Sequence, residues 1–367
     1  MKVALVNDWL TSRGGEINVL FALSDLFPEA PIYTSVANKE KIPELKSKDV
    51  RTSWLQKMPF ASKIHKMIPM LRPHAFESLN LAEFDVVISS SHAESKGVIT
   101  KPDTVHICYC HTPTRYYWSN YHEYRHHMEF GILNPIARIA MPIFIHGLRQ
   151  WDYLAAQRVD HFIANSQFVA ERIRKYYRRD AKVIYPPVDT IGHQYDPSVQ
   201  REDYYFTMSR LIPYKRFDLL VKAATEAGVK LKVAGSGPEL KKLQKIAGAN
   251  VEFLGYVTDD MKKSLMQKAK AFLFAAEEDF GIVPVEAMAC GTPVLAYGKG
   301  GLAEIVTPES GILVKEQTVA AFVEGIKQME QAVFDNAAVR KRSEAFSLAV
   351  FNREIKSFVQ SVTTRDS

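Results

Sequence analysis

The sequence predicts an α/β fold with parallel sheets, arranged as two domains. Short apolar runs rich in β-branched residues alternate with segments of helical periodicity, as expected of repeated βαβ units. The 367 residues exceed one ordinary domain and fit two of about 150–190 residues each. Hydrophobic residues make up 47% of the chain and charged residues 24%, which supports two buried cores and argues against disorder.

The first domain is expected to contain strands at residues 2–7, 84–89, 105–109 and 161–164. A helix from Gly14 to Phe27 follows the first of these strands. Apolar residues recur there with helical spacing until Pro28 ends the pattern.

The second domain repeats this pattern, with strands expected at residues 204–208, 230–234, 251–254, 271–274, 293–296 and 312–314. Helices are expected between them, including residues 216–227 and 258–270. A polar, proline-containing segment at residues 185–201 predicts the boundary, which gives domains of residues 1–190 and 191–350. A last helical stretch lies within residues 351–367.

Cysteine usage and apolar patterning predict a cytosolic protein. The three cysteines, Cys108, Cys110 and Cys290, provide neither a disulfide framework nor the ligands of a zinc site. The first residues lack the apolar run of a signal peptide. The most apolar later stretch, residues 136–148, is interrupted by polar residues and is shorter than the ~20 residues that span a bilayer. Any membrane contact is therefore expected from the surface.

Two glutamates, Glu278 and Glu286, follow the expected strand at residues 271–274. Pro284 suits the first turn of a helix, and we expect Glu286 in that same turn. Both carboxylates then lie at the edge where open α/β sheets bind ligands, and each is suited to accept hydrogen bonds from the hydroxyl groups of a ligand. The alternative is that Glu286 is an acid favoured at a helix start by the macrodipole.

Arg210 and Lys215 follow another expected strand of the second domain. Two fixed cations can stabilise the negative charge of an anionic leaving group, so no metal ion is expected at the site. An Asp-x-Asp sequence at a strand end is absent from this domain. The alternative is a solvated basic turn, because Arg216 adjoins Lys215.

Glycines and a histidine complete the candidate set. Gly14 and Gly15 let backbone amides approach a phosphate at a helix N-terminus, although the full dinucleotide-binding pattern is absent and a tight turn is the alternative. Gly235 sits in a similar Gly-Ser-Gly-Pro turn, for which an ordinary strand–helix connection explains the pattern nearly as well. His111 starts a polar, aromatic loop and suits a hydrogen bond to a sugar, whereas a lone histidine is more often structural.

Several blocks together resemble the retaining glycosyltransferases of family 4, which have the GT-B fold of two Rossmann-like domains facing a cleft. The blocks occur in the family's order: 7–9, 14–16, 111–113, 165–166, Arg210 with Lys215, 235–238 and 278–286. The extended block at residues 278–293 is the most specific of them.

The resemblance implies a division of roles. The first domain holds the acceptor, the second holds the nucleotide sugar, and the terminal helix returns to the first domain. The implied catalytic residues are His111, Glu278, Arg210 and Lys215. The implied donor-binding residues are Gly14, Gly15, Gly235, Phe280, Gly281, Ile282 and Glu286. Within this set Glu278 meets the donor sugar, Glu286 the ribose, and the two cations the diphosphate.

Residues 111–118 and 277–281 resemble bacterial O-antigen mannosyltransferases that use GDP-mannose. The resemblance implies transfer of mannose from GDP-mannose to a lipid-linked glycan in polysaccharide biosynthesis, with no cofactor besides the donor. Three alternatives stay open: a UDP-sugar-dependent transferase, a sugar-nucleotide epimerase, and a non-enzymatic module that binds polyanions or lipid.

Residues 51–72 mix basic and apolar side chains and contain no acidic residue. This composition suits a peripheral contact with anionic lipid on the inner face of the cell membrane. The alternative is that the apolar side chains pack in the core and the lysines are solvated. No nucleic-acid-binding motif accompanies the segment, and no nucleic-acid partner is expected.

Overall fold

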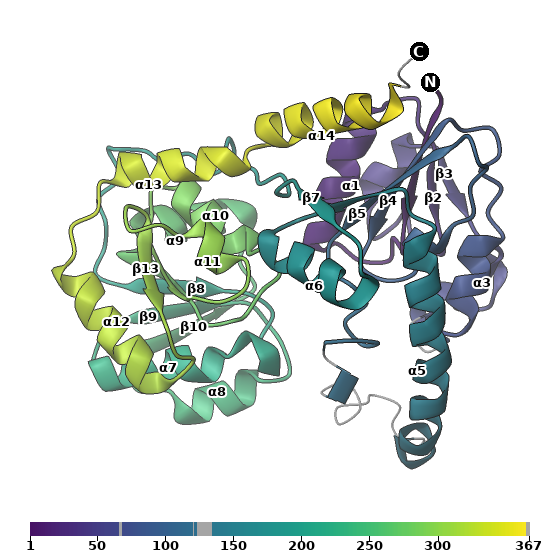
Figure 1. Cartoon of the computed structure of the whole chain (residues 1–367). Coiled ribbons are helices and arrows are strands. Elements are labelled where there is room, and N and C mark those ends of the chain that lie inside the picture. The colour runs from purple at the N-terminus through teal and green to yellow at the C-terminus, as the bar shows by residue number, and fades with distance from the viewer. Residues whose placement is uncertain (66–67, 120, 123–133, 365–367) are drawn as a thin grey trace. The chain divides into compact units, whose positions relative to one another are not determined.

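The computed structural model describes all residues except 66–67, 120, 123–133 and 365–367 (Figure 1). The chain divides into two compact units, Met1–Pro186 with the C-terminal segment from Asn352, and Pro187–Phe351. The division thus falls four residues before the expected boundary. Each unit is built on a parallel sheet, which confirms the expected α/β class.

In the described part of the first unit, the sheet has the strand order β3-β2-β1-β4-β5-β6-β7, with every pair parallel. Four expected strands are present: β1 (Val3–Asn7), β4 (Val86–Ser91), β5 (Val105–Cys110) and β6 (His161–Ala164). The prediction missed β2 (Ile32–Thr34), β3 (Val50–Thr52) and β7 (Ala181–Val183). Each has three residues, which is too short to show an alternating pattern.

The α-helices in the described part of this unit are α1 (Gly15–Leu26), α2 (Ala61–Ile64), α3 (Leu71–Glu77), α5 (Asn134–Gln157) and α6 (Gln167–Tyr177). The last helix, α14 (Leu348–Thr363), joins the first unit from Asn352, where Phe358 contacts His161 with ring centroids 6.1 Å apart. Among the described residues, no helix combines the length and the apolar character needed to cross a membrane.

The second unit has the strand order β10-β9-β8-β11-β12-β13, again parallel throughout. The strands are β8 (Tyr205–Met208), β9 (Leu231–Ala234), β10 (Val251–Gly255), β11 (Ala271–Phe274), β12 (Val294–Tyr297) and β13 (Gly311–Val314). All six lie where the sequence predicts them.

Helices cover both faces of this second sheet. Figure 1 shows α7 (Phe217–Ala227), α8 (Leu240–Ile246) and α12 (Val319–Gln331) on one face. On the other face lie α9 (Asp259–Lys268), α10 (Ile282–Ala289) and α11 (Leu302–Ile305), and α13 (Asn336–Ser343) packs against α10. The apolar faces of α7 and α12 pack with the central strands in one core cluster.

Both strand orders contain a switch point, where the chain stops adding strands on one side and continues on the other. In the first unit it lies between β1 and β4, and in the second between β8 and β11. Loops after the two central strands diverge there, which leaves room for ligands at the carboxyl ends of the strands. Functional side chains are therefore expected directly after these four strands.

Gly235 keeps the loop after β9 in close contact with the loop after β8. It follows β9 with φ +123°, and a Cβ at this position would collide with the carbonyl oxygen of Ser209. Gly237 approaches the carbonyl of Leu211 in the same way. These glycines pack the loop after β9 against the loop that carries Arg210.

Replacing Gly235 by alanine is expected to lower the free energy of unfolding of the second unit by at least about 1–3 kcal/mol, because both the backbone conformation and the space exclude a side chain. Gly147→Ala in α5 is the matched control. No atom lies within 4 Å of a Cβ at that position, and alanine should stabilise the helix by about 0.5–1 kcal/mol. Urea unfolding of both variants measures this, and equal stabilities would contradict the packing argument.

His106 is a buried, neutral side chain between β4 and β5. Its Nε2 is 2.9 Å from the hydroxyl of Ser89. Burial lowers the pKa of His106 to about 4, with Asp160 opposing and Arg158 reinforcing the shift. The unfolded chain, with a histidine pKa near 6.5, therefore binds more protons than the folded protein between about pH 6.5 and pH 4.

Stability should consequently fall as the pH falls through this window, by up to about 1.4 kcal/mol per pH unit from His106. His106→Gln loses a hydrogen bond, so it should be less stable than the wild type at pH 7. Because the variant lacks the group that takes up a proton on unfolding, the difference in free energy of unfolding between wild type and variant should narrow between pH 7 and pH 5. Thermal unfolding at both pH values measures the gap, with the exposed His74→Gln as control. A gap that stays constant with pH would refute the assignment.

Candidate active site

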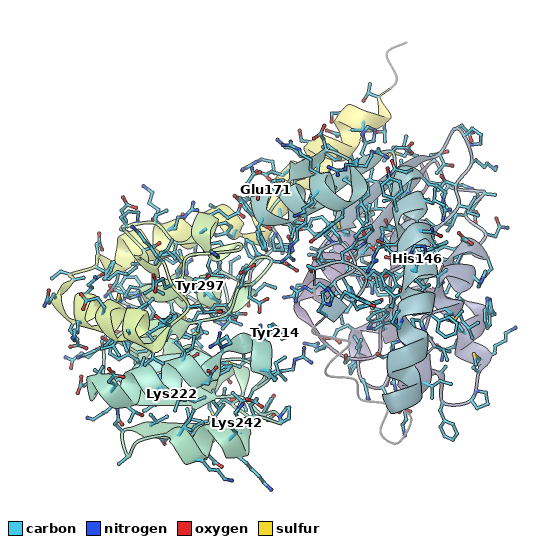
Figure 2. The ribbon with its side chains drawn as sticks, turned by 60° about the horizontal axis from the view of Figure 1, so that its bottom comes forward. His146, Glu171, Tyr214, Lys222, Lys242 and Tyr297 are labelled. Atoms are coloured by element: carbon cyan, nitrogen blue, oxygen red, sulfur yellow. The ribbon has the colours of Figure 1, made fainter. Side chains whose placement is uncertain are left out.

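Lys215 and Glu278 span the switch point of the second unit. Lys215 ends a short 3₁₀ turn (Pro213–Lys215) after β8, and Glu278 follows β11. The Lys215 ammonium donates to a carboxylate oxygen of Glu278, and their side chains are 14% and 15% exposed. Tyr214, labelled in Figure 2, has its ring centroid 5.2 Å from the same ammonium. The structure therefore brings together two residues that the sequence places 63 positions apart.

The neighbouring cations differ from Lys215. Arg210 is exposed, and its guanidinium has no hydrogen-bond or ion-pair partner within the described residues. Arg216 adopts the left-handed conformation with φ 54° and is held by Asp218 and Gln317. Lys215 is thus neither solvated nor interchangeable with Arg216, while the guanidinium of Arg210 remains available for an anion.

The N-terminus of α10 offers backbone donors beside this pair. Gly281 precedes the helix with φ 119°, and a Cβ there would meet Leu302. No side chain caps the helix, so the N–H groups of its first residues, from Ile282, lack intrahelical partners. Phe280 is buried against Phe346, with ring centroids 5.5 Å apart, and fixes the loop. Such a helix start is suited to binding phosphate or hydroxyl oxygens.

Glu286 lies one turn later than expected. Because α10 begins at Ile282, Glu286 is in the second turn, where the macrodipole explanation has little force. Its carboxylate pairs with Lys262 of α9 at 3.2 Å, and the two side chains are 12% and 11% exposed. Lys262 also lies 3.5 Å from Asp259, whose side chain is 97% exposed. The sequence analysis missed Lys262, because a lysine in a polar helix is typical of a solvated surface.

His111 follows β5 in the first unit and is held on three sides. Its ring Nε2 is 2.8 Å from the Ser90 hydroxyl. Its backbone N–H donates to the Ser91 carbonyl, and its backbone carbonyl accepts from the Asn165 side chain. Burial, reinforced by His92, lowers the pKa of His111 to about 3. The imidazole is therefore neutral at physiological pH and acts as a hydrogen-bonding group.

Asp8 is a second buried acid at this sheet edge, and the sequence analysis assigned it no role. Its carboxylate accepts backbone N–H bonds from His92, Ala93 and Ser95 at 2.7, 3.0 and 2.7 Å. Burial opposes ionisation, but the charge of His92 and these backbone bonds outweigh it and lower the pKa of Asp8. The carboxylate is therefore ionised and fixed in orientation.

Gly14 and Gly15 open α1, as predicted, but an acid already lies over them. Gly14 precedes the helix in an extended conformation. A Cβ at Gly14 would meet the carboxylate of Glu16, which folds back over the helix start. A phosphate at this N-terminus would therefore have to displace the flexible Glu16 side chain.

The loop after His111 is anchored by two buried ion pairs. Arg72 lies 3.0 Å from Glu94, and Lys96 lies 2.5 Å from Asp152, with all four side chains at most 3% exposed. Aromatic residues of the loop donate to these carboxylates: Tyr116 and Tyr117 to Glu94 at 2.9 and 2.7 Å, and Trp118 to Asp152 at 2.7 Å. The polar groups of these aromatic residues are thus engaged in holding the loop.

The segment at residues 51–72 divides between core and surface. Leu55 and Ala61 are buried, and Arg72 is buried in its ion pair, so these residues of the segment do not face lipid. The exposed basic and apolar residues of the segment include Trp54, Lys57, Phe60, Lys63 and Met70. Lys66 and Met67 lie outside the described residues.

Within the described residues, no group of three or more histidine, cysteine, aspartate and glutamate side chains is arranged to hold a metal ion. The three cysteines are buried free thiols.

Comparison with known proteins gives matches along nearly the whole chain. Residues 9–191 match the family described as Glycosyltransferase Family 4, and residues 193–344 match the family described as Glycosyl transferases group 1. A GDP-mannose-dependent phosphatidylinositol monomannoside mannosyltransferase of Corynebacterium glutamicum is 32% identical over 163 residues, which are 40% of this chain and 43% of that protein.

The α-1,3/1,6-mannosyltransferase ALG2 of Saccharomyces cerevisiae is 27% identical over 230 residues, 48% of this chain and 44% of that protein. The chain thus matches less than half the length of these curated relatives. The solved structure of Anabaena HepE in complex with UDP superposes with a TM-score of 0.71 and 19% identity, and the match covers 98% of this chain and 100% of HepE. That likeness confirms the fold expected from the sequence. The chain belongs to the family 4 glycosyltransferases, enzymes of the GT-B fold.

Proposed function

We propose that this glycosyltransferase transfers mannose from GDP-mannose to a hydroxyl group of a lipid-linked glycan. The second unit holds the donor and the first unit the acceptor. The observation that carries the proposal is the row of charged side chains after β8, β10 and β11, in which Lys215 pairs with Glu278 and Lys262 pairs with Glu286. Both curated relatives described above are named as mannosyltransferases.

The diphosphate is bound by the cations and the helix start. The guanidinium of Arg210 is free to bind a phosphate, and Lys215 follows Arg210 in the same segment after β8. The unpaired N–H groups at the start of α10 supply further donors. As the glycosidic bond breaks, negative charge builds up on the leaving diphosphate, and these groups stabilise that charge more strongly in the transition state than in the ground state.

The two glutamates then respond differently to donor binding. When Lys215 turns to the phosphate, the carboxylate of Glu278 is released to accept the hydroxyl groups of the sugar. Glu286 accepts the ribose hydroxyls in the same manner, while Lys262 keeps its charge neutralised. Glu278 exchanges one polar partner for another and Glu286 keeps Lys262, so neither partly buried carboxylate is left unpaired.

Asp259 supports guanine as the base. Asp259 lies 3.5 Å from Lys262, and Lys262 in turn contacts Glu286. One lysine therefore separates Asp259 from the carboxylate that we propose binds the ribose. Guanine presents two adjacent N–H donor groups on its pairing edge, which one carboxylate accepts together. Uracil presents a single N–H between two carbonyl oxygens, which a carboxylate repels. The exposed Asp259 therefore favours guanosine over uridine donors.

We expect GDP-mannose to give a faster initial rate of nucleotide release than UDP-glucose and UDP-GlcNAc, and a rate about ten- to a hundred-fold above GDP-glucose. The second factor follows from the cost of about 1–3 kcal/mol for stranding a buried hydrogen-bond partner at the inverted C2 hydroxyl. A uridine donor that runs faster than GDP-mannose would leave the family assignment standing and remove the proposed donor.

Replacement of Asp259 by asparagine is expected to reduce the preference for GDP over UDP by about ten-fold or more, since each lost or mismatched contact at the base costs about 1–3 kcal/mol. Asp260→Asn is the matched control, because Asp260 is the next residue of α9 and is also exposed. Dissociation constants of GDP and UDP from calorimetry measure the preference. An unchanged ratio in Asp259→Asn would show that the base is read elsewhere.

The three alternatives left open by the sequence do not stand equally. Both matching families are glycosyltransferases, which sets aside the epimerase and the non-enzymatic binding module. A UDP-sugar donor stays the competing hypothesis, because HepE, which shares the fold, is solved in complex with UDP. The donor comparison above distinguishes the two.

We further propose that the exposed part of residues 51–72 contacts anionic lipid. Trp54 and Phe60 are 41% and 74% exposed, and Lys57 and Lys63 lie among them. Phe60 also holds φ 55°, a conformation that is unfavourable for a bulky residue, while it presents its ring to solvent. Aromatic and basic side chains in one short segment suit the headgroup region of a membrane.

The double variant Lys57→Glu/Lys63→Glu is expected to sediment with phosphatidylglycerol-containing liposomes several-fold less than the wild type, and high salt should weaken the wild-type binding. Lys222→Glu/Lys242→Glu makes the same charge change at two exposed lysines of α7 and α8 (Figure 2) and serves as control. Equal losses in both double variants would indicate an effect of net charge and would reject this surface.

A further inference from the structure

Arg216 holds a backbone conformation that favours glycine. It lies between the 3₁₀ turn that ends at Lys215 and the start of α7 at Phe217, with φ 54° and ψ 38°. A side chain is unfavourable in this left-handed region, whereas glycine adopts it readily. Among the non-glycine residues that the structure describes, only Phe60 and Arg178 share this feature. An arginine at this position therefore indicates that its guanidinium has a role of its own.

The guanidinium of Arg216 is engaged by two partners. Its Nε and one terminal nitrogen donate to the two carboxylate oxygens of Asp218 at 3.2 and 3.4 Å. The other terminal nitrogen donates to the amide oxygen of Gln317 at 3.0 Å. Asp218 is a local partner in the first turn of α7, whereas Gln317 lies 101 positions further along the chain. The contact with Gln317 therefore joins two separate loops at the carboxyl ends of the strands.

Gln317 extends this contact to the loop that carries Glu278. It lies between β13 and α12, and its amide nitrogen donates to the carbonyl oxygen of Ala275 at 2.8 Å. Ala275 is buried directly after β11, in the segment that leads to Glu278. A glutamine suits this position because its amide both accepts and donates hydrogen bonds. We refer to the chain of contacts from Arg216 through Gln317 to Ala275 as the amide bridge.

The backbones of Lys215 and Glu278 are held from different directions. The loop after β12 fixes Glu278, because the Gly301 N–H donates to its carbonyl at 2.8 Å and Gly300 lies beside it in a parallel bridge. The amide bridge acts on the other member of the pair, since it ties the residue after Lys215 to the backbone after β11. It therefore fixes the separation of the two loops whose side chains meet at the switch point.

Two simpler roles for Arg216 explain fewer of these contacts. Stabilisation of the helix start does not account for it, because a positive charge is unfavourable at the N-terminus of α7. Direct binding of the donor's anion would require the guanidinium to leave both Asp218 and Gln317. Neither role explains why Gln317 also holds the carbonyl of Ala275.

We propose that Arg216 and Gln317 are positioning residues, which hold Lys215 in place beside Glu278 for binding of the donor diphosphate. The amide bridge keeps the backbone of Lys215 fixed while its ammonium turns from the carboxylate to the phosphate. A cation stabilises the leaving diphosphate best when its position is already set before the glycosidic bond breaks. The inference rests on the proposed function, in which Lys215 binds the diphosphate.

Gln317→Ala is the main test, because it breaks the amide bridge and leaves the backbone of Arg216 unchanged. It should lower kcat for release of GDP from GDP-mannose, with octyl α-mannoside as acceptor, by about ten-fold, since a small misplacement of a catalytic group is costly. The KM for donor should change little, because the ground-state contacts of the donor remain. A wild-type kcat in Gln317→Ala, or a loss confined to KM, would overturn the proposal.

The control for this variant is Gln244→Ala, which removes an exposed glutamine of α8 and should keep the wild-type kcat and KM. Gln317→Glu is the closest isostere of the native side chain. Its carboxylate still accepts from Arg216 but cannot donate to the carbonyl of Ala275. It should therefore be as slow as Gln317→Ala although its pairing with Arg216 is retained. A wild-type kcat in Gln317→Glu would show that the contact with Ala275 is not required, and would reject the bridge.

A double variant tests whether the two residues act together. Arg216→Gly suits the left-handed conformation and removes the guanidinium, so it should lower kcat as Gln317→Ala does. Because both changes break one bridge, Arg216→Gly/Gln317→Ala should be no slower than the slower single variant. Multiplicative losses in the double variant would mean that the residues act independently, and would contradict the proposal. Thermal unfolding of each variant confirms that the rates refer to folded protein.

The donor comparison keeps this inference separate from the proposed function. If another nucleotide sugar gives a faster rate than GDP-mannose, the same variants are measured with that donor. The amide bridge acts on the diphosphate, which all of the compared donors share. The proposed donor would then be wrong, while the rates of the Arg216 and Gln317 variants would still decide whether the bridge positions Lys215.

Discussion

The structure depends on the stabilisation of charged side chains at the switch point of each parallel sheet. Two strand ends diverge there, and the loops after them carry ionisable side chains into a place with little solvent. A charge in that position is costly without a partner. The chain meets this constraint with an acid–base pair in each unit, Lys215 with Glu278 and His92 with Asp8. In the second unit, Lys215 and Glu278 neutralise each other in the absence of a ligand.

This starting state explains why the expected ligand-binding glutamates are found bound to lysines. Glu278 and Glu286 are each only about one-eighth exposed and cannot remain unpaired without a penalty. A ligand that offers hydroxyl groups alone would replace a charged partner by neutral ones and strand the lysine. A ligand that offers both hydroxyl groups and a diphosphate satisfies both members of the pair. Under the proposed function, the pairing thus favours a sugar joined to a diphosphate before any single contact to the sugar is considered.

The sequence predicted the features that depend on local pattern and missed those that depend on pairing. All strands of the second sheet follow from apolar runs bounded by turns, and the positions of Lys215 and Glu278 after β8 and β11 follow from those strands. The prediction that Glu286 lies in the first turn of α10 was wrong, because Pro284 is equally acceptable at the first or the third helical position. Lys262 and His92 could not be recognised, because their significance comes from a partner distant in sequence. A polar run of serines ending in His92 after β4 was the only local signal.

The buried pairs around the His111 loop contribute position more than stability. Removing charges from water costs several kcal/mol per ion, and apolar replacements of buried pairs are often equally stable. Arg72–Glu94 and Lys96–Asp152 nevertheless bind the hydroxyl and indole groups of Tyr116, Tyr117 and Trp118. These directional bonds fix the course of the loop that begins at His111, in a way that apolar packing would not. The aromatic sequence that resembles mannosyltransferases therefore holds a neutral His111 at the end of β5 beside His92.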